Sequence, residues 1–451
     1  MSVLFSPLLW AASPDTPAQG YDFINLAAIL IALTALFAYL NHRFLRLAPS
    51  IGVMALALAF SLAVVLVGLI VPAVEQKATE LVKQIDFNKT VLNGMLGFLL
   101  FAGALHIDLD DLASRKVLIA VLATVGVVLT TLIVGLCTWL VLSGLGVPAR
   151  LLYCFMFGAL IAPTDPIAVL AMLKEAAAPK PLEVTIAGES LFNDGVGVVV
   201  FLGFLQAALS GQDITLAGLA WAFLQEGVGG ALFGLAGGVL FYYLFKSVDR
   251  YQVEILLSLA LVAGGYALAT YLHVSAPIAI VVAGLLIGNH GRTFAMSETT
   301  REHLDTFWEL IDEILNALLF VLLGVEVLAL TFTASYLGIG LLLIPFILLA
   351  RLAAVMLPVV MLRQWMPIDR YTGRLLWWGG LRGGLSVAMA LSVPELVAGE
   401  PIPERKWMLT ATYVVVAFSI LVQGLTVGPL MRRWLRSNSA TPSTSLTPAQ
   451  P

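Results

Sequence analysis

The stretch Ile161-Ala-Pro-Thr-Asp-Pro-Ile167 decides the fold, because it places two prolines and an aspartate inside an apolar run from 150 to 173. Proline removes a backbone hydrogen bond from a helix and clashes with the preceding turn, so a helix is expected to break here. A second polar stretch, Gly188-Glu-Ser-Leu-Phe-Asn-Asp-Gly195, lies in the apolar run from 183 to 209. A charge near the middle of a membrane span costs about 2.5 to 3.5 kcal/mol on insertion scales and usually marks function.

The composition is that of an integral membrane protein. Of 451 residues, 60% are hydrophobic and 12% are charged, against about 25% charged in a soluble domain. The apolar runs approach the ~20 residues that cross a bilayer as a helix, so we expect an all-α polytopic membrane protein with about thirteen transmembrane helices. The predicted spans are 23–41, 51–71, 90–108, 117–143, 150–173, 183–209, 216–245, 254–272, 276–289, 307–330, 336–362, 375–396 and 407–431.

The basic residues predict the orientation. Sixteen of the 24 Lys and Arg residues fall in loops on one side, six fall on the other side and two fall within spans. Positive loops are cytoplasmic, so we expect the N-terminus outside and the C-terminus inside, in the cell inner (plasma) membrane. Residues 1–22 are then an external segment, and the Ser-, Thr- and Pro-rich residues 437–451 a disordered cytoplasmic tail. We expect no enzyme activity, resident cofactor or nucleic-acid partner.

The transmembrane domain, 23–436, divides into two six-helix halves, 23–209 and 254–431, joined by a linker helix at 216–245. The halves enter the membrane with opposite orientation, as inverted repeats of secondary transporters do. The fifth span of each half carries helix breakers: Pro163 and Pro166 in one, and Gly379-Gly380-Leu381-Arg382-Gly383-Gly384 in the other. Broken helices persist in a membrane only where they are buried in protein or line a watery cavity, so the two breaks are expected to cross at an ion site. The glycines of 227–238 indicate either another break or close helix packing.

The span 183–209 carries its polar residues on two neighbouring stripes, Glu189 with Asn193 and Ser190 with Asp194. Together with Thr164 and Asp165, the second stripe supplies the oxygen ligands that a hard cation such as Na⁺ prefers. Arg382 needs a buried counter-ion, and Glu189 is its predicted partner in a structural ion pair. Asp165 and Asp194 then remain as the acids that compete for cations. Because a desolvated carboxyl group titrates above its ordinary pKa of ~3.9, such a group can exchange a proton for a cation near neutral pH.

Two other classes of protein use membrane carboxylates. An intramembrane aspartyl protease needs two aspartates that share a proton, but its Gly-x-Gly-Asp order is absent around Asp194. A cation channel needs neither a titrating pair nor inverted broken helices. Both remain alternatives to a secondary active transporter.

Four runs together resemble the NhaP-type sodium/proton antiporters, of the cation:proton antiporter family related to the Na⁺/H⁺ exchangers. The runs are Ala162-Pro-Thr-Asp-Pro166, Gly188-Glu-Ser-Leu-Phe-Asn-Asp194, Phe307-Trp-Glu-Leu-Ile-Asp-Glu-Ile-Leu-Asn-Ala-Leu-Leu-Phe320 and Leu381-Arg-Gly-Gly-Leu-Ser386. The resemblance covers nearly the whole chain. It implies a homodimer whose protomers each have a dimerisation domain and a six-helix core domain that moves like an elevator.

The resemblance also implies roles for individual residues. Asp194 is the exchanging carboxylate. Asp165, Thr164 and Ser190 help it to bind Na⁺, with Li⁺ and K⁺ as alternative ions, and Asn193 supports the site. The order Asn193-Asp194, where electrogenic relatives have two aspartates, implies electroneutral one-for-one exchange. One position departs from the pattern, because Ala102 stands where several family members carry a glutamate.

Two further polar clusters have ordinary explanations. Glu309, Asp312, Glu313 and Asn316 form a stripe on one helix face, which predicts a water-facing funnel rather than ion ligands. His106 and the acids Asp108, Asp110 and Asp111 indicate a solvated helix end, with a pH sensor as the alternative. Glu326 and Arg351 form a possible ion pair.

Overall fold

The computed structural model describes residues 23–176, 178–210, 221, 224–329, 333–369, 371–397 and 400–439. These residues are almost entirely helical, with one short hairpin of β1 (Leu396–Val397) and β2 (Glu400–Pro401). Within the described residues, eight helices are long and apolar enough to cross a membrane. The predicted all-α membrane fold is confirmed, whereas the count of thirteen spans stays a prediction. The other predicted spans are shorter or broken helices, apart from 307–330, most of which lies in the long helix Glu298–Glu326 with its acidic stripe. The segment 1–22 lies outside the described residues.

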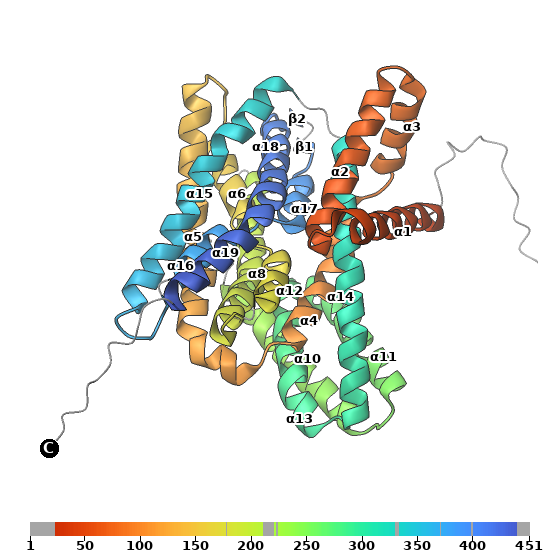
Figure 1. The fold of residues 1–451 in the computed structure, drawn as a ribbon, viewed down its shortest axis with the longest axis vertical. Helices are drawn as coiled ribbons and strands as arrows, with labels where there is room; N and C mark the ends of the chain where they lie inside the picture. The colour runs from red at the N-terminus through yellow and green to blue at the C-terminus, as the bar shows by residue number, and fades with distance from the viewer. Residues whose placement is uncertain are drawn as a thin grey trace, which may run out of the picture.

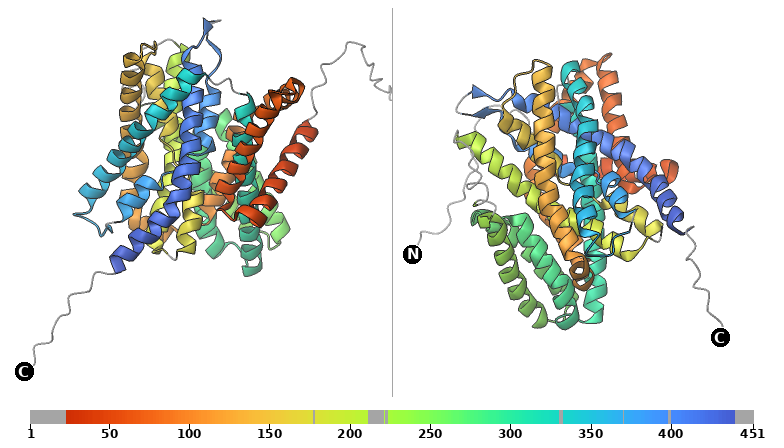
Figure 2. Two further views of the ribbon diagram at one scale, coloured as in Figure 1. Left: turned by 45° about the horizontal axis from the view of Figure 1, so that its top comes forward. Right: turned by 90° about the vertical axis from the view of Figure 1, so that its left-hand side faces the viewer.

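One group of helices surrounds the two predicted breaks (Figure 1). Its helices α5 and α15 run side by side, and α18 packs against α15 at an angle (Figure 2, right). The members are α5 (Leu109–Gly144), α6 (Leu151–Ile161), α7 (Ile167–Glu175), α8 (Lys180–Ser210), α15 (Ala334–Leu362), α16 (Thr372–Trp378), α17 (Gly384–Ser392), α18 (Glu404–Phe418), η6 (Ser419–Gln423) and α19 (Gly424–Ser439). We call these helices the first group. The tail predicted to begin at 437 is helical to Ser439, and its remainder lies outside the described residues.

The other helices form the second group, at the right and bottom of Figure 1. They are α1 (Phe23–Leu40), η1 (Asn41–Leu45), α2 (Pro49–Gly68), α3 (Pro72–Lys83), η2 (Lys89–Met95), α4 (Leu96–Leu105), η3 (Leu224–Val228), α10 (Gly229–Lys246), α11 (Tyr251–Tyr271), α12 (Ala276–Leu286), η4 (Ile287–Gly291), α13 (Arg292–Phe294), α14 (Glu298–Glu326) and η5 (Val327–Ala329). The polar helix α3 was not predicted, since its sequence is too charged for a span.

Local chemistry accounts for two features of these helices. Asp108 caps α5, because its Oδ1 accepts hydrogen bonds from the backbone N–H groups of Asp110 and Asp111 at 2.8 and 3.2 Å. The helix-end interpretation of these acids is therefore confirmed, and α5 begins eight residues before the predicted span. In α10, a Cβ atom at Gly234 would lie 2.1 Å from the carbonyl oxygen of Ala279. The glycines of α10 thus serve close packing against α12.

A cavity of about 2010 Å³ lies between the two groups of helices. The first group contributes α7, α8 and α17 to its wall, and the second contributes α2, α4 and α14. The cavity extends to Arg43, Arg46, Lys174, Lys180 and Arg292, whose positive charges predict a cytoplasmic location. The cavity therefore opens toward the predicted cytoplasmic side.

Candidate functional site

The two predicted helix breaks meet. One lies between the end of α6 at Ile161 and the start of α7 at Ile167, and the other between the end of α16 at Trp378 and the start of α17 at Gly384. The backbone N–H of Asp165 donates to the carbonyl oxygen of Leu381 at 2.8 Å, in a single antiparallel bridge. Each break thereby satisfies a backbone group that the other helix leaves free, as the apolar surroundings require.

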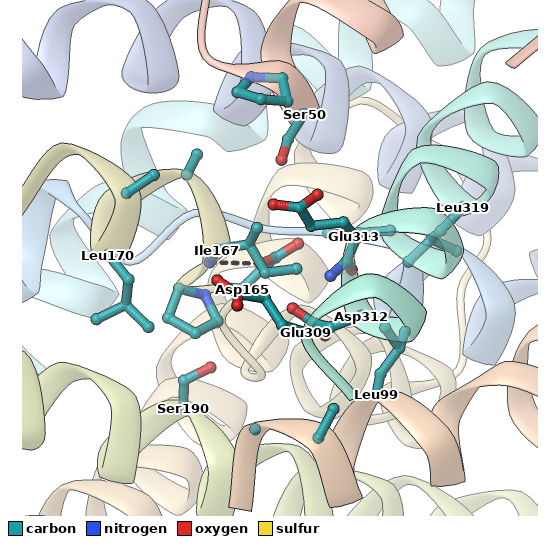
Figure 3. Close-up of a pocket in the computed structure, with 18 of the residues that line it drawn as sticks. Ser50, Leu99, Asp165, Ile167, Leu170, Ser190, Glu309, Asp312, Glu313 and Leu319 are labelled. Carbon is teal, nitrogen blue, oxygen red and sulfur yellow. Dashed lines mark hydrogen bonds between the residues drawn. The ribbon is translucent and has the colours of Figure 1, made fainter. Parts of the chain in front are cut away.

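Close packing at this crossing places the Asp165 carboxylate. A Cβ atom at Gly383 would lie 2.5 Å from Asp165 Oδ2, so only glycine lets the two broken segments approach this closely. Asp165 Oδ1 accepts a hydrogen bond from the N–H of Ile167 at 2.9 Å, which ties the carboxylate to the start of α7. The side chain is half-buried and reaches the cavity (Figure 3).

Thr164 fastens the first break to α8. Asn193 Oδ1 accepts from the N–H of Thr164 at 3.2 Å, and Asn193 Nδ2 donates to the Thr164 hydroxyl at 2.8 Å. The Ser190 hydroxyl donates to the carbonyl oxygen of Thr164. All three side chains are buried, so the predicted supporting role of Asn193 has a structural basis. The hydroxyl groups of Thr164 and Ser190 already hold the break in place.

Asp194 lies one turn after Ser190 on α8, and it lines the cavity together with Asp165. It is half-buried, and its side chain makes no hydrogen bond or ion pair within the described part of the chain. The negative charges of Asp165 and Glu189 repel its carboxylate. The structure thus brings the two predicted acids to one cavity, where either a proton or a cation relieves their repulsion.

The predicted ion pair between Glu189 and Arg382 is wrong, because Glu189 pairs with Arg351 of α15. The Arg351 Nη1 and Nη2 atoms donate to Glu189 Oε1 and Oε2 at 2.8 and 3.0 Å. Both side chains are buried, with exposed fractions of 5% and 2%. Asn193 Nδ2 adds a hydrogen bond to Glu189 Oε1 at 2.9 Å. The suggested pair of Arg351 with Glu326 is wrong for the same reason.

Arg382 is bonded locally instead. Its Nη1 donates to the carbonyl oxygen of Gly380 at 2.9 Å, and its backbone N–H donates to the Ser419 hydroxyl at 2.8 Å. The side chain is buried, and its Nε has no hydrogen-bond partner in the part of the chain that the structure describes. The Arg382 guanidinium is attracted by Glu189 and repelled by Arg351. It therefore adds positive charge near the ion pair of Glu189 and Arg351 without being a member of that pair.

The polar stripe of α14 faces the cavity, as the funnel hypothesis predicted. Glu309, Asp312 and Glu313 line the cavity, and Figure 3 shows them extending from α14 toward Asp165. Ala102 is buried in the cavity wall. Among the residues that the structure describes, no three His, Cys, Asp or Glu side chains converge as a metal site.

Comparison with known proteins places this geometry in a family. The family model for the transmembrane part of sodium/hydrogen exchangers matches residues 29–433. The chain is 51% identical to the Na⁺/H⁺ antiporter NhaP of Pseudomonas aeruginosa, over 91% of this chain and 96% of that protein. It is 35% identical to the Na⁺/H⁺ antiporter NhaH of Halobacillus dabanensis, over 86% and 96%.

A solved structure shares the fold. The sodium proton antiporter MjNhaP1 of Methanocaldococcus jannaschii superposes with a TM-score of 0.69, covering 93% of this chain and 98% of that one at 19% identity. The resemblance seen in the sequence motifs is therefore confirmed by the whole-chain comparisons. With its two broken helices meeting beside a pair of cavity-facing aspartates, the chain belongs to the sodium/hydrogen exchanger family and is of the NhaP type.

Proposed function

We propose that the protein exchanges Na⁺ for protons across the membrane, with Asp194 as the carboxylate that binds either ion. One observation carries this proposal: Asp165 and Asp194 both face the cavity, whereas Glu189 is neutralised by Arg351. Two acids are then available to a cation in a site rich in oxygen atoms, which suits hard monovalent cations. The names of the relatives point to the same activity.

The roles of the other residues follow from their positions. Asp165 is the second charged ligand, and Thr164 and Ser190 add oxygen atoms at the break between α6 and α7. Asn193 holds Thr164, and the pair of Glu189 and Arg351 fastens α8 to α15. Li⁺ and K⁺ are further candidate ions, since the methyl group of Ala102 offers no oxygen ligand at the position where the family pattern often has a glutamate.

The stoichiometry in this proposal is one proton per cation. The pair of Glu189 and Arg351 has no net charge, so a single alternating aspartate gives the loaded carrier the same charge in both directions. Movement of the first group of helices against the second, in a homodimer, is the proposed route to alternating access, because the cavity lies between these groups. The N-terminus is proposed to lie outside and the C-terminus in the cytoplasm.

Reconstitution tests the proposal. Purified protein in liposomes should convert an imposed Na⁺ gradient into uphill proton movement, measured with a pH-sensitive dye inside the vesicles. Asp194→Asn should abolish this movement while leaving a folded protein. Asp249→Asn, an equivalent change at an exposed residue outside the cavity, should keep it. Sodium-driven proton movement by the purified Asp194→Asn variant would contradict the assignment of Asp194. If the wild-type protein were a channel or a protease, it would drive no uphill proton movement.

A further inference from the structure

Two buried polar side chains in the cavity wall lack hydrogen-bond partners among the described residues. Within that part of the chain, neither the Oδ1 nor the Nδ2 atom of Asn316 makes a hydrogen bond of normal geometry, and neither does the Ser386 hydroxyl. The residues are only 4% and 1% exposed, yet both line the cavity. A buried polar group left unsatisfied costs about 1 to 3 kcal/mol. These atoms are therefore expected to bind something that enters the cavity.

Asn316 and Ser386 come from the two sides of the cavity. Asn316 lies on α14, in the second group of helices, and Ser386 lies on α17, in the first. A Cβ atom at Gly384 would lie 2.5 Å from Leu319 Cδ1, so α17 touches α14 less than one turn from each of them. Both unpartnered side chains thus lie within one helical turn of a contact between these two helices.

The chemistry at this contact is that of a cation site. Asp312 lies one turn before Asn316 on α14 and approaches its amide without completing a hydrogen bond of normal geometry. The Asp312 carboxylate also interacts electrostatically with Asp165, and Figure 3 shows the two facing each other. A carboxylate, an amide oxygen and a hydroxyl oxygen are hard ligands, and the negative charge favours a cation over water alone.

We propose that Asp312, Asn316 and Ser386 form a second binding position for a partly hydrated monovalent cation, between the cavity mouth and the site at Asp165 and Asp194. This proposal rests on the proposed exchange of cations for protons and adds a step to it. Because its ligands come from both groups of helices, the position is complete only while α14 and α17 are in contact. In the arrangement that the structure shows, with the cavity open, this position concentrates Na⁺ beside Asp165. It loses its set of ligands when the first and second groups of helices move apart.

A binding measurement separates the two positions. The melting temperature of the purified full-length protein is titrated with NaCl, replacing choline chloride at constant ionic strength. A ligand that binds only the folded state stabilises it by RT ln(1 + [L]/Kd), so the dependence of Tm on Na⁺ gives the half-saturating concentration. The Asp194→Asn variant should retain part of the Na⁺-dependent rise. Adding Asn316→Leu and Ser386→Ala to Asp194→Asn should remove the rise or increase the half-saturating Na⁺ concentration about threefold to tenfold, as expected for losing neutral ligands.

Thr138→Val is the matched control for these changes. Thr138 also carries a buried hydroxyl that has no partner among the described residues, but it lies on α5 outside the cavity wall. This variant should leave the half-saturating Na⁺ concentration unchanged. Asn316→Asp, which keeps the size of the side chain and adds a negative charge, should lower that concentration.

The outcomes distinguish this proposal from the proposed exchange. Two results would overturn the second position: a Tm of the Asp194→Asn variant that does not depend on Na⁺, or a half-saturating Na⁺ concentration that stays the same after both the Asn316 and Ser386 changes. If the wild-type protein moves no protons in liposomes while the titrations behave as expected, the exchange proposal fails and the second position stands. In liposomes, the single Asn316→Leu variant should need a Na⁺ concentration for half-maximal exchange about threefold to tenfold higher than the wild-type protein needs.

Discussion

Replacing Arg351 with methionine should lower the free energy of unfolding by about 3 to 5 kcal/mol, because it leaves Glu189 charged and buried without its partner. Arg351 makes two hydrogen bonds to Glu189, and the two side chains are 5% and 2% exposed. Methionine keeps the unbranched apolar stem of arginine and removes the charge. At ~2.1 cal/mol/K of unfolding entropy per residue, a chain of 451 residues should lose about 3 to 5 °C in Tm.

A double-mutant cycle tests the pairing. Arg351→Met, Glu189→Gln and the double variant are compared by Tm and by denaturant unfolding in detergent, and Arg382→Met enters a second cycle with Glu189→Gln. Glutamine retains an acceptor for Asn193, whose bond to Glu189 measures 2.9 Å. We expect the interaction energy of Glu189 with Arg351 to exceed the ~0.3 to 0.5 kcal/mol that independent sites show, by several-fold. The energy with Arg382 should be smaller, because no direct bond joins these residues.

Additive losses for Glu189 and Arg351, together with a large interaction energy between Glu189 and Arg382, would refute this reasoning. That result would restore the pairing that the sequence predicted. Retention of transport in the double variant of the first cycle would further show that the pair serves stability rather than ion binding.

Two other substitutions and one change of membrane potential test the site. Asp165→Asn should raise the Na⁺ concentration for half-maximal exchange and reduce the exchange rate more than it reduces expression, and normal exchange would remove Asp165 from the ion ligands. Gly383→Ala should abolish exchange, since its Cβ would lie 2.5 Å from Asp165 Oδ2, whereas Gly338→Ala, with open space around it, should be active. Sodium-driven proton movement should be the same with and without a potential clamped by valinomycin and potassium; a strong dependence on voltage would make Asp165 a second proton carrier.

The breaks and the aspartates could be predicted because their signals are local. Pro163 and Pro166 cannot continue a helix whatever surrounds them, and the paired glycines around Leu381 mark the other break. A carboxylate in an apolar run needs a functional explanation wherever the run lies. The meeting of the breaks through Asp165 and Leu381 then follows from the need to satisfy freed backbone groups.

The partner of Glu189 could not be chosen from the sequence. Arg351 and Arg382 both lie inside predicted spans, and either could neutralise a buried glutamate. The choice depends on how α15 is rotated against α8, across a sequence separation of 162 residues. The position of Arg351 in the middle of a predicted span indicates that it needs a buried acidic partner. Because Glu326 was considered as that partner, Glu189 was not.

The role of Asn316 was missed for a related reason. Its spacing from Glu309 and Asp312 predicted a polar helix face, which the structure confirms. Nothing in that spacing shows that the amide is buried without a partner among the described residues, or that Ser386 also lines the cavity. Those facts arise from the contact of α14 with α17, which a single helix pattern does not contain.

The anchored backbone at the breaks has a consequence for hydrogen–deuterium exchange. The amides of Thr164, Asp165 and Arg382 are bonded to Asn193, Leu381 and Ser419, at 3.2, 2.8 and 2.8 Å. Although they lie beside a large cavity, these amides should exchange with solvent as slowly as those of an intact helix. If this protection persists during turnover, the two broken helices move together as a rigid unit through the transport cycle. Their backbone then does not unwind further at the prolines and glycines that break the helices.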